Sequence, residues 1–254
     1  MSSATISQPD AWACGRIPTL NERGFTTEIP DPLSQQFVEL AAGIDAEVLD
    51  IGCAYGVVVK RALAVGGRVC ACDMDQRHLD VLSNSVKPAD KSRLRCVAGT
   101  LPEVNFDDSS FGAILCSRVL HFLEGPDIER TVSKMHRWLR PGGKLFLIVD
   151  SPYSGITSVR TGPEYERKKA SGDPWPGFVA DYNSYLPSGS RVKFATSFIH
   201  LMDPETLSRV CERAGLVVES KAYMARVANL ARADPQGRDH AAVVASKAYQ
   251  DCRW

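Results

Sequence analysis

The chain has 254 residues, of which 44% are hydrophobic and 24% charged, a composition typical of a folded protein with one sizeable domain. Thirty lysines and arginines balance thirty aspartates and glutamates, so no net field attracts nucleic acid or an anionic membrane. The balanced net charge does not exclude a local basic patch. Because the first ten residues are polar and the longest apolar runs are strand-sized, we expect neither a secretory signal nor a membrane span.

The first 30 residues, rich in Pro, Gly and Thr, predict an irregular arm. Asp31–Ala42 predicts a short helix, with Asp31 as its cap and Pro32 at its first position. Apolar runs then alternate with helical patterns. Strands are expected at 47–51, 68–72, 93–97, 111–116, 144–149, 216–220 and 241–245, and helices at 57–65, 76–86, 128–139 and 204–214. We expect Pro141-Gly142-Gly143 to terminate the helix at 128–139.

Strands that alternate with helices predict an α/β fold: a doubly wound, Rossmann-like, seven-stranded and mostly parallel sheet with helices on both faces. Residues 153–197 break this rhythm and are rich in Gly, Pro and aromatic residues, so we expect an inserted lid after the fifth strand. The expected organisation is an arm and helix at 1–42, a Rossmann-like domain at 43–152 and 198–254, and a lid or acceptor segment at 153–197.

The eight cysteines are scattered and lack paired CxxC spacing, so the sequence predicts neither a zinc site nor a disulfide framework. Several of them stand inside apolar, strand-like runs, where a thiol behaves as a small hydrophobic group. We therefore expect a reduced protein in the cytoplasm, without a bound metal.

The first of the alternating strands runs directly into a glycine loop, Gly52-Cys53-Ala54-Tyr55-Gly56, and a helix follows at once. Glycines permit close backbone approach by a ligand, and the start of a helix adds unpaired amides. Open α/β sheets bind ligands at this edge, where the strands have their carboxyl ends. A purely structural turn is the alternative. Asp50, just before the loop, suits a cationic ligand better than a pyrophosphate.

Asp73 stands at the tip of the next strand, 21 positions after Gly52. An acid in this place can accept two hydrogen bonds from a ribose diol. A helix cap is the alternative role, for which Asp75 is better placed. Folds that bind NAD use the same acid, but their G-x-G-x-x-G fingerprint differs from the G-x-A-x-G spacing of Gly52, Ala54 and Gly56.

Together these segments resemble the class I S-adenosylmethionine-dependent methyltransferases. Val48–Gly56 is similar to the first motif of that family, VLDIGCGxG, with Ala54 in place of the middle glycine. Asp73 and Met74 match the acidic residue and its apolar follower, which in the family hold the ribose and pack on the adenine.

Weaker matches follow in the family's order, and the resemblance covers roughly residues 40–150 with an echo from 200 to 248. Gly99-Thr100-Leu101-Pro102 stands where the family often has Gly-Asp-Ala, Phe111–Phe122 resembles the fourth-strand motif, and Trp138–Leu145 resembles an L-(K/R)-P-G-G element. Thr100 and Gly112 depart from the common aspartates of their motifs. The resemblance implies S-adenosyl-L-methionine as cofactor, bound by Asp50, Gly52, Ala54, Gly56, Asp73, Met74, Thr100, Leu101 and Ser117.

Methyl transfer from a sulfonium is an in-line displacement, so the protein has chiefly to align the nucleophile and exclude water. An acceptor that carries a proton also benefits from a general base. The candidate catalytic residues are His121, after the fourth strand, and His200, near the returning end of the insertion. For each of them a histidine packed for structural reasons is the alternative.

The resemblance thus implies a methyltransferase that acts on O, N or C of a small-molecule acceptor, with no membrane partner and nucleic acid not expected. Methylation of a protein or RNA, and a non-catalytic methyltransferase-like module that binds the cofactor or only a partner, are the alternatives. An aminopropyl-transferring relative would share this fold. Three roles are open for the aromatic residues of the insertion: they line the acceptor pocket, form a small core of their own or make a dimer contact. A homodimer is therefore one of the alternatives.

Overall fold

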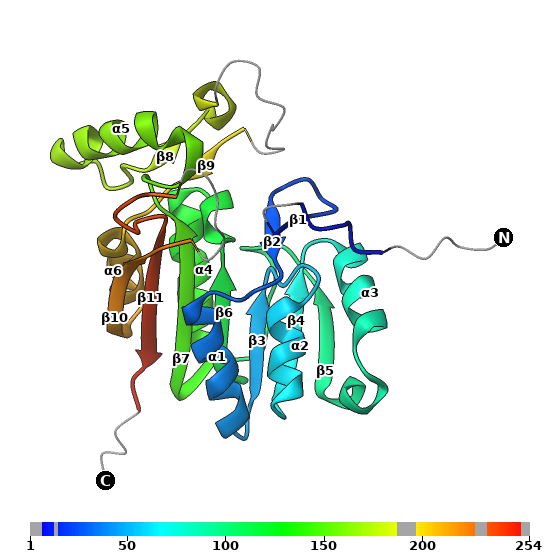
Figure 1. The fold of residues 1–254 in the computed structure, drawn as a ribbon. Coiled ribbons are helices and arrows are strands. Elements are labelled where there is room, and N and C mark those ends of the chain that lie inside the picture. Colours follow the sequence, from blue (N-terminus) through cyan, green and yellow to red (C-terminus); the bar gives the residue numbers. More distant parts are fainter. Residues whose placement is uncertain (1–6, 13–14, 187–196, 227–232, 250–254) are drawn as a thin grey trace, which may run out of the picture.

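A central sheet of seven strands organises the protein, whose computed structural model describes residues 7–12, 15–186, 197–226 and 233–249. The strand order is β10-β11-β7-β6-β3-β4-β5 (Figure 1). Every pair from β5 through β7 is parallel, whereas β11 runs antiparallel to both β7 and β10. This topology confirms the predicted doubly wound, mostly parallel sheet.

The predicted elements are present, with ends that differ by a few residues. The strands of the sheet are β3 (Glu47–Ile51), β4 (Arg68–Asp73), β5 (Leu94–Ala98), β6 (Phe111–Ser117), β7 (Leu139–Asp150), β10 (Leu216–Met224) and β11 (His240–Lys247). The helices are α1 (Pro32–Gly43), α2 (Val57–Ala64), α3 (Gln76–Ser85), α4 (Gly125–Trp138), α5 (Ser158–Ala170) and α6 (Pro204–Arg213). Among the described residues no helix combines the length and apolar character that crossing a membrane requires.

Alternation along each strand divides the core into two layers, because successive side chains of a strand point to opposite faces. In β3, Val48 packs with helices α1, α2 and α3, whereas Leu49 and Ile51 pack with α4 and α6 on the other face. Helix α1 therefore belongs to the layered core. It begins as predicted, with the Asp31 carboxylate accepting a hydrogen bond from the Ser34 amide at 2.8 Å.

The N-terminal residues correct the prediction of an irregular arm. Strand β1 (Arg16–Pro18) pairs antiparallel with β2 (Phe25–Thr27) and forms a hairpin, named here the N-terminal hairpin (residues 16–27). Strands of three residues are too short to produce the alternation by which a strand is recognised in a sequence.

The prediction that Pro141-Gly142-Gly143 terminates a helix is also wrong. Helix α4 ends at Trp138, and β7 begins at the next residue and runs through all three positions. Opposite Phe111 of β6 lies Leu139, but opposite Ala113 lies Lys144. The extra residues form a bulge in β7, which Gly142 permits with a φ of +76°.

Two separate segments cover the edge of the sheet where the parallel strands have their carboxyl ends (Figure 1). The N-terminal hairpin lies at this edge beside β3 and β4. Helix α5 and the short antiparallel pair β8 (Phe178–Val179) and β9 (Ile199–His200) lie beyond β7 and β11. Part of the expected lid, residues 187–196, lies outside the described residues.

Candidate active site

The glycine loop after β3 has a left-handed backbone at three positions. Gly52 and Gly56 have φ of +73° and +70°, and Ala54 has φ of +45°. A Cβ atom on Gly52 would lie 2.2 Å from Val119 Cγ2, and one on Gly56 would lie 2.3 Å from Leu82 Cδ1. Both glycines are therefore required for backbone conformation and for space, whereas Ala54 accepts the left-handed region and buries its methyl group.

The Asp50 carboxylate lies buried directly below this loop, at the end of β3. No other described residue forms a hydrogen bond or ion pair with it. Burial, followed by repulsion from the Asp73 and Asp31 carboxylates, raises the pKa of Asp50 to about 7. A buried carboxylate without a partner is costly, so a cationic ligand at this position would stabilise its ionised form.

Asp73, at the tip of the adjacent strand β4, is also buried but has several partners. Its Oδ2 accepts from the Ala54 amide at 2.9 Å, and its Oδ1 accepts from the Asp75 amide at 2.9 Å and contacts His78 Nδ1 at 3.0 Å. Asp75 itself caps α3, as expected. A carboxylate has about four acceptor positions, and three of those on Asp73 are in use.

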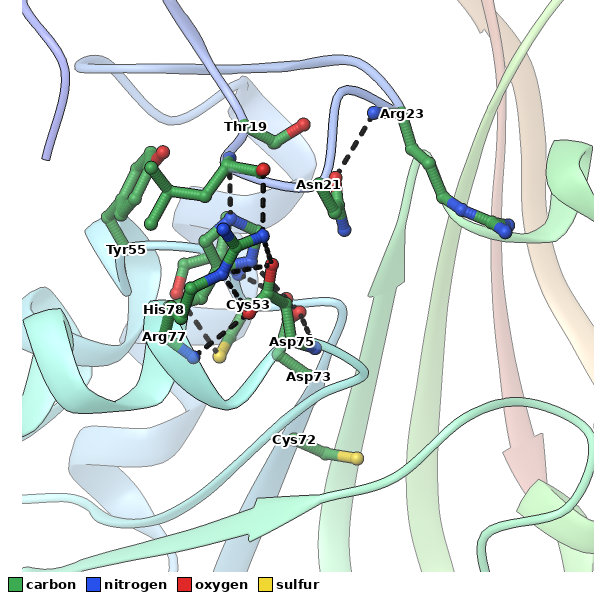
Figure 2. A network of polar contacts seen from close by, with 12 residues as sticks. Thr19, Asn21, Arg23, Cys53, Tyr55, Cys72, Asp73, Asp75, Arg77 and His78 are labelled. Atoms are coloured by element: carbon green, nitrogen blue, oxygen red, sulfur yellow. Dashed lines mark hydrogen bonds and ion pairs between the residues drawn. The ribbon is translucent and has the colours of Figure 1, made fainter. Parts of the chain in front are cut away.

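His78 connects Asp73 to the N-terminal hairpin (Figure 2). The Leu20 amide donates to His78 Nε2 at 2.9 Å, and the ring is 1% exposed. Sequence reasoning missed His78 because its partner Leu20 is 58 positions away in the chain. A histidine five residues after a candidate ribose acid is the only local signal that could have indicated it.

The remaining predicted cofactor residues differ in exposure. Met74 is 41% exposed beside Asp73, an unusual position for a large apolar side chain and one that a planar ligand could cover. Thr100 is exposed, whereas Leu101 is buried in the main core and presents little surface to a ligand. Ser117 is half-buried at the end of β6, where its hydroxyl accepts from Arg118 at 2.9 Å.

His121 is buried in a short turn after β6. The Asp150 amide donates to its Nδ1 over 3.4 Å, so the lone pair of the neutral ring is directed to the backbone and Nε2 carries the proton. Burial lowers the pKa of His121 to about 4. In this tautomer His121 is a hydrogen-bond donor rather than a base.

A second histidine, His240, lies beside Asp150 at the same sheet edge and was missed by sequence reasoning. Its Nδ1 is 2.9 Å from Asp150 Oδ1, although neither ring nitrogen forms a well-aligned hydrogen bond with a described residue. His240 starts β11 and Asp150 ends β7, and these positions are directly paired in the sheet. Only this register brings the two side chains together, so the sequence gives no signal for the contact.

His200 has the opposite tautomer to His121. Its Nδ1 lies 3.3 Å from the Leu123 carbonyl oxygen, which can only accept, so Nδ1 carries the proton and Nε2 holds the lone pair. Nε2 is buried without a hydrogen-bond partner among the described residues. Burial lowers the pKa of His200 to about 4, which keeps the ring neutral at pH 7.

His200 lines a pocket of about 250 Å³ between the insertion and the start of α4. Trp175 and Phe178 contact its ring edge-on, with centroids 4.8 and 5.7 Å away. The other lining residues include Glu124, Lys168 and Asp173. The Met202 amide donates to the Asp150 carbonyl at 3.1 Å, which ties the strand of His200 to the carboxyl end of β7.

The structure thus brings most predicted site residues to one edge of the sheet, in two groups. The glycine loop, Asp50, Asp73 and Met74 lie at the ends of β3 and β4, whereas His121 and His200 lie by the ends of β6 and β7. Among the described residues, no cluster of three or more His, Cys, Asp or Glu side chains could hold a metal ion.

Several known proteins with related sequences are methyltransferases. The methyltransferase domain family matches residues 49–147. An uncharacterised methyltransferase of Mycobacterium tuberculosis is 33% identical over 101 residues, 40% of this chain and 38% of that protein. The demethylmenaquinone methyltransferase of Listeria monocytogenes is 29% identical over 40% of the chain and 43% of its own length. The chain thus spans about two fifths of the length of these relatives.

A longer match covers 73% of the chain and 70% of the ubiquinone biosynthesis O-methyltransferase of Aromatoleum aromaticum, at 24% identity. Solved structures share the fold. A methyltransferase from Methanosarcina mazei superposes with a TM-score of 0.62 over 84% of this chain and 98% of its own, at 15% identity. The glycopeptide N-methyltransferase MtfA, crystallised with S-adenosylmethionine, superposes with a TM-score of 0.56 over 84% of this chain and 92% of its own, at 16% identity.

The sheet order, the glycine loop between two buried acids and the matched domain agree with one another. Residues 49–147 therefore match the methyltransferase domain family, and the described chain has the fold of S-adenosylmethionine-dependent methyltransferases.

Proposed function

We propose that the protein transfers a methyl group from S-adenosylmethionine to oxygen, nitrogen or carbon of a small-molecule acceptor. The observation that carries the proposal is the Asp50 carboxylate, which lies buried and without a partner under the glycine loop. The proposal extends beyond the domain family, because the family alone leaves the acceptor open.

The residues at the ends of β3 and β4 fit the charge and shape of this cofactor. Asp50 would compensate the positive charge of its amino acid portion, because an opposite charge stabilises a buried carboxylate. Gly52 and Gly56 keep the loop free of side chains, Asp73 would accept a ribose hydroxyl, and the exposed Met74 would cover the adenine. When bound, the cofactor supplies a methyl group activated by its sulfonium.

The pocket beside His200 is the proposed acceptor site. Aromatic walls suit a largely apolar molecule, and Nε2 of His200 offers an acceptor for an O–H or N–H group. Because the Leu123 carbonyl holds the proton on Nδ1, Nε2 can take the proton that the acceptor loses. Trp175 and Phe178 cover the ring, so this segment has to move before the acceptor reaches Nε2.

His121 receives a different role in this proposal. Its Nδ1 accepts from the Asp150 amide, so the ring orients the end of β7 and its Nε2–H can donate to a bound ligand. The similarity to a ubiquinone biosynthesis O-methyltransferase and a demethylmenaquinone methyltransferase supports a small-molecule acceptor. Methylation of protein or RNA and a non-catalytic cofactor-binding module are the competing functions.

The first test is binding. S-Adenosylhomocysteine should raise the melting temperature, since a ligand stabilises the folded state by RT ln(1 + [L]/Kd). The second test offers labelled S-adenosylmethionine together with a small-metabolite extract, an RNA fraction or a protein fraction. We expect label only in small molecules. Absence of binding at millimolar ligand contradicts the cofactor assignment, and label in RNA or protein contradicts the acceptor assignment.

A third test addresses the base. Changing His200→Gln should lower the turnover rate by about 10²- to 10⁴-fold, the range for loss of a general base, and leave the Kd for S-adenosylhomocysteine unchanged. His136→Gln, on the distant part of α4, is the matched control. A near-normal rate for His200→Gln would remove His200 from the proposed mechanism.

A further inference from the structure

We infer that His78 is a positioning residue that joins the N-terminal hairpin to the Asp73 carboxylate and leaves one acceptor position on Asp73 for a single ribose hydroxyl. This inference rests on the proposed binding of S-adenosylmethionine. It assigns a role to a buried histidine and to a hairpin that the catalytic proposal does not use.

The two contacts of the His78 ring define its tautomer. A backbone amide can only donate, so the contact from the Leu20 amide at 2.9 Å makes Nε2 an acceptor. In the neutral ring the proton is then on Nδ1, which donates to Asp73 Oδ1 at 3.0 Å. One ring therefore fixes a backbone group of the hairpin and a carboxylate oxygen of the cofactor site (Figure 2).

Three acceptor positions of the Asp73 carboxylate are already occupied. Oδ1 is fully used, by His78 and by the Asp75 amide, and Oδ2 is used once, by the Ala54 amide. One position on Oδ2 remains of the four that a carboxylate offers. The two hydroxyls of a ribose would therefore contribute unequally to binding, and only the one that reaches Oδ2 would bond to Asp73.

Further contacts hold the hairpin on the glycine loop. The Tyr55 hydroxyl donates to the Pro18 carbonyl at 2.8 Å, and Arg77 donates to the Leu20 carbonyl at 2.8 Å. Ile17 and Leu20 pack against Ala54 and Tyr55 of the glycine loop. Docking of the hairpin and orientation of Asp73 thus both depend on His78, so each stabilises the other. If docking of the hairpin raises the affinity for the cofactor by some factor, bound cofactor should favour docking of the hairpin by the same factor.

Two substitutions separate the two contacts of the ring. In His78→Asn the amide nitrogen occupies nearly the place of Nδ1, so the bond to Asp73 is kept and the bond to Leu20 is lost. In His78→Phe both bonds are lost, while the ring contact with Tyr55 is retained. Arg77→Ala is the matched control, because it removes a contact with the hairpin that does not involve Asp73.

The experiment measures calorimetric Kd values for S-adenosylhomocysteine and for its 2′-deoxy and 3′-deoxy analogues, with hydrogen exchange of residues 16–27 in parallel. In the wild type we expect one deoxy analogue to bind about tenfold more weakly and the other nearly normally, as for a single hydrogen bond to a charged group. His78→Phe should weaken the binding of S-adenosylhomocysteine about tenfold and remove the difference in affinity between the two deoxy analogues. His78→Asn and Arg77→Ala should retain that difference.

Hydrogen exchange tests the coupling to the hairpin. S-Adenosylhomocysteine should slow exchange in residues 16–27 of the wild type and have little effect there in either His78 variant. Equal penalties for both deoxy analogues in the wild type, or a His78→Phe affinity within twofold of the wild type, would overturn the inference. If His78→Phe does not fold, the affinities of the wild type for the two deoxy analogues and the hydrogen exchange of His78→Asn test the inference instead. A wild type that does not bind S-adenosylhomocysteine contradicts the proposed function instead.

Discussion

The indole of Trp175 occupies the space above Gly125: a Cβ atom added to Gly125 would lie 2.4 Å from both Nε1 and Cε2 of that ring. The absence of a side chain at the start of α4 therefore allows the insertion to cover His200. Gly125→Ala should displace Trp175 and raise the KM for the acceptor several-fold, while the Kd for S-adenosylhomocysteine stays unchanged. Steady-state kinetics measure the KM for the acceptor, and calorimetry measures the Kd for S-adenosylhomocysteine. Gly43→Ala, where the added atom meets nothing within 4 Å, is the control.

The glycine loop should be intolerant of side chains. Gly52→Ala combines a left-handed backbone with a contact of 2.2 Å to Val119, and we expect it to destabilise the fold by about 2–4 kcal/mol. Gly66→Ala has a φ of +97° but open space around the added atom, so it should cost about 1–2 kcal/mol. Urea unfolding of both variants measures the difference. Equal losses would show that crowding by Val119 contributes nothing.

Asp50 predicts opposite effects of pH on stability and on ligand binding. Its pKa of about 7 lies above the usual value of 3.8, so the folded state holds the proton more tightly and loses stability as pH rises from about 4 to 7. Asp50→Asn should melt at a higher temperature than the unliganded wild type at pH 8, with a smaller difference at pH 5. Differential scanning calorimetry measures both, and a lower melting temperature of the variant at pH 8 would contradict the assignment.

Binding of the cofactor should require the ionised form of Asp50. The affinity of the wild type for S-adenosylhomocysteine should rise up to about pH 7 and then level, with about a tenfold change per pH unit below the pKa. In Asp50→Asn this slope should be lost and binding at pH 8 should be at least about tenfold weaker. A pH-independent wild-type Kd would show that Asp50 does not compensate a ligand charge.

The buried histidines predict a loss of stability in mild acid. Burial lowers the pKa of both His121 and His200 to about 4, below the unfolded value of 6.5. The unfolded state therefore binds more protons, and stability that is present above pH 6.5 is lost as pH falls towards 4. Replacing either histidine by Gln should flatten the melting temperature between pH 7 and 5. An unchanged slope in both variants would contradict the buried, neutral state of these rings.

The sequence predicted the strands, the loop and the acids at the strand tips because these features are local. An apolar strand that ends in Gly52, and another that ends in Asp73, carry their signal within a few residues. The parallel direction of the strands from β5 through β7 follows from the alternation of helices and strands. The same locality explains why Asp75 was correctly expected to cap α3.

The parts that the sequence did not reveal depend on contacts between distant segments. His78 obtains its role from Leu20, and His240 obtains its position from the antiparallel pairing of β11 with β7. The number of hydrogen bonds that Asp73 can still accept depends on backbone amides whose direction no residue pattern records. For His200 and His121, the residue type was predicted, but the tautomer follows from a carbonyl and an amide in the folded chain.

The reversed direction of β11 has a practical consequence. This strand starts at the edge that holds the proposed site, with His240, and ends at the opposite edge, with Lys247. Lys247 therefore lies on the side away from the proposed site (Figure 1), so a purification tag, dye or surface linker attached next to it would point away from that site. One attached ahead of Arg16 would sit next to the hairpin, so immobilised binding assays should anchor the protein through its C-terminal side.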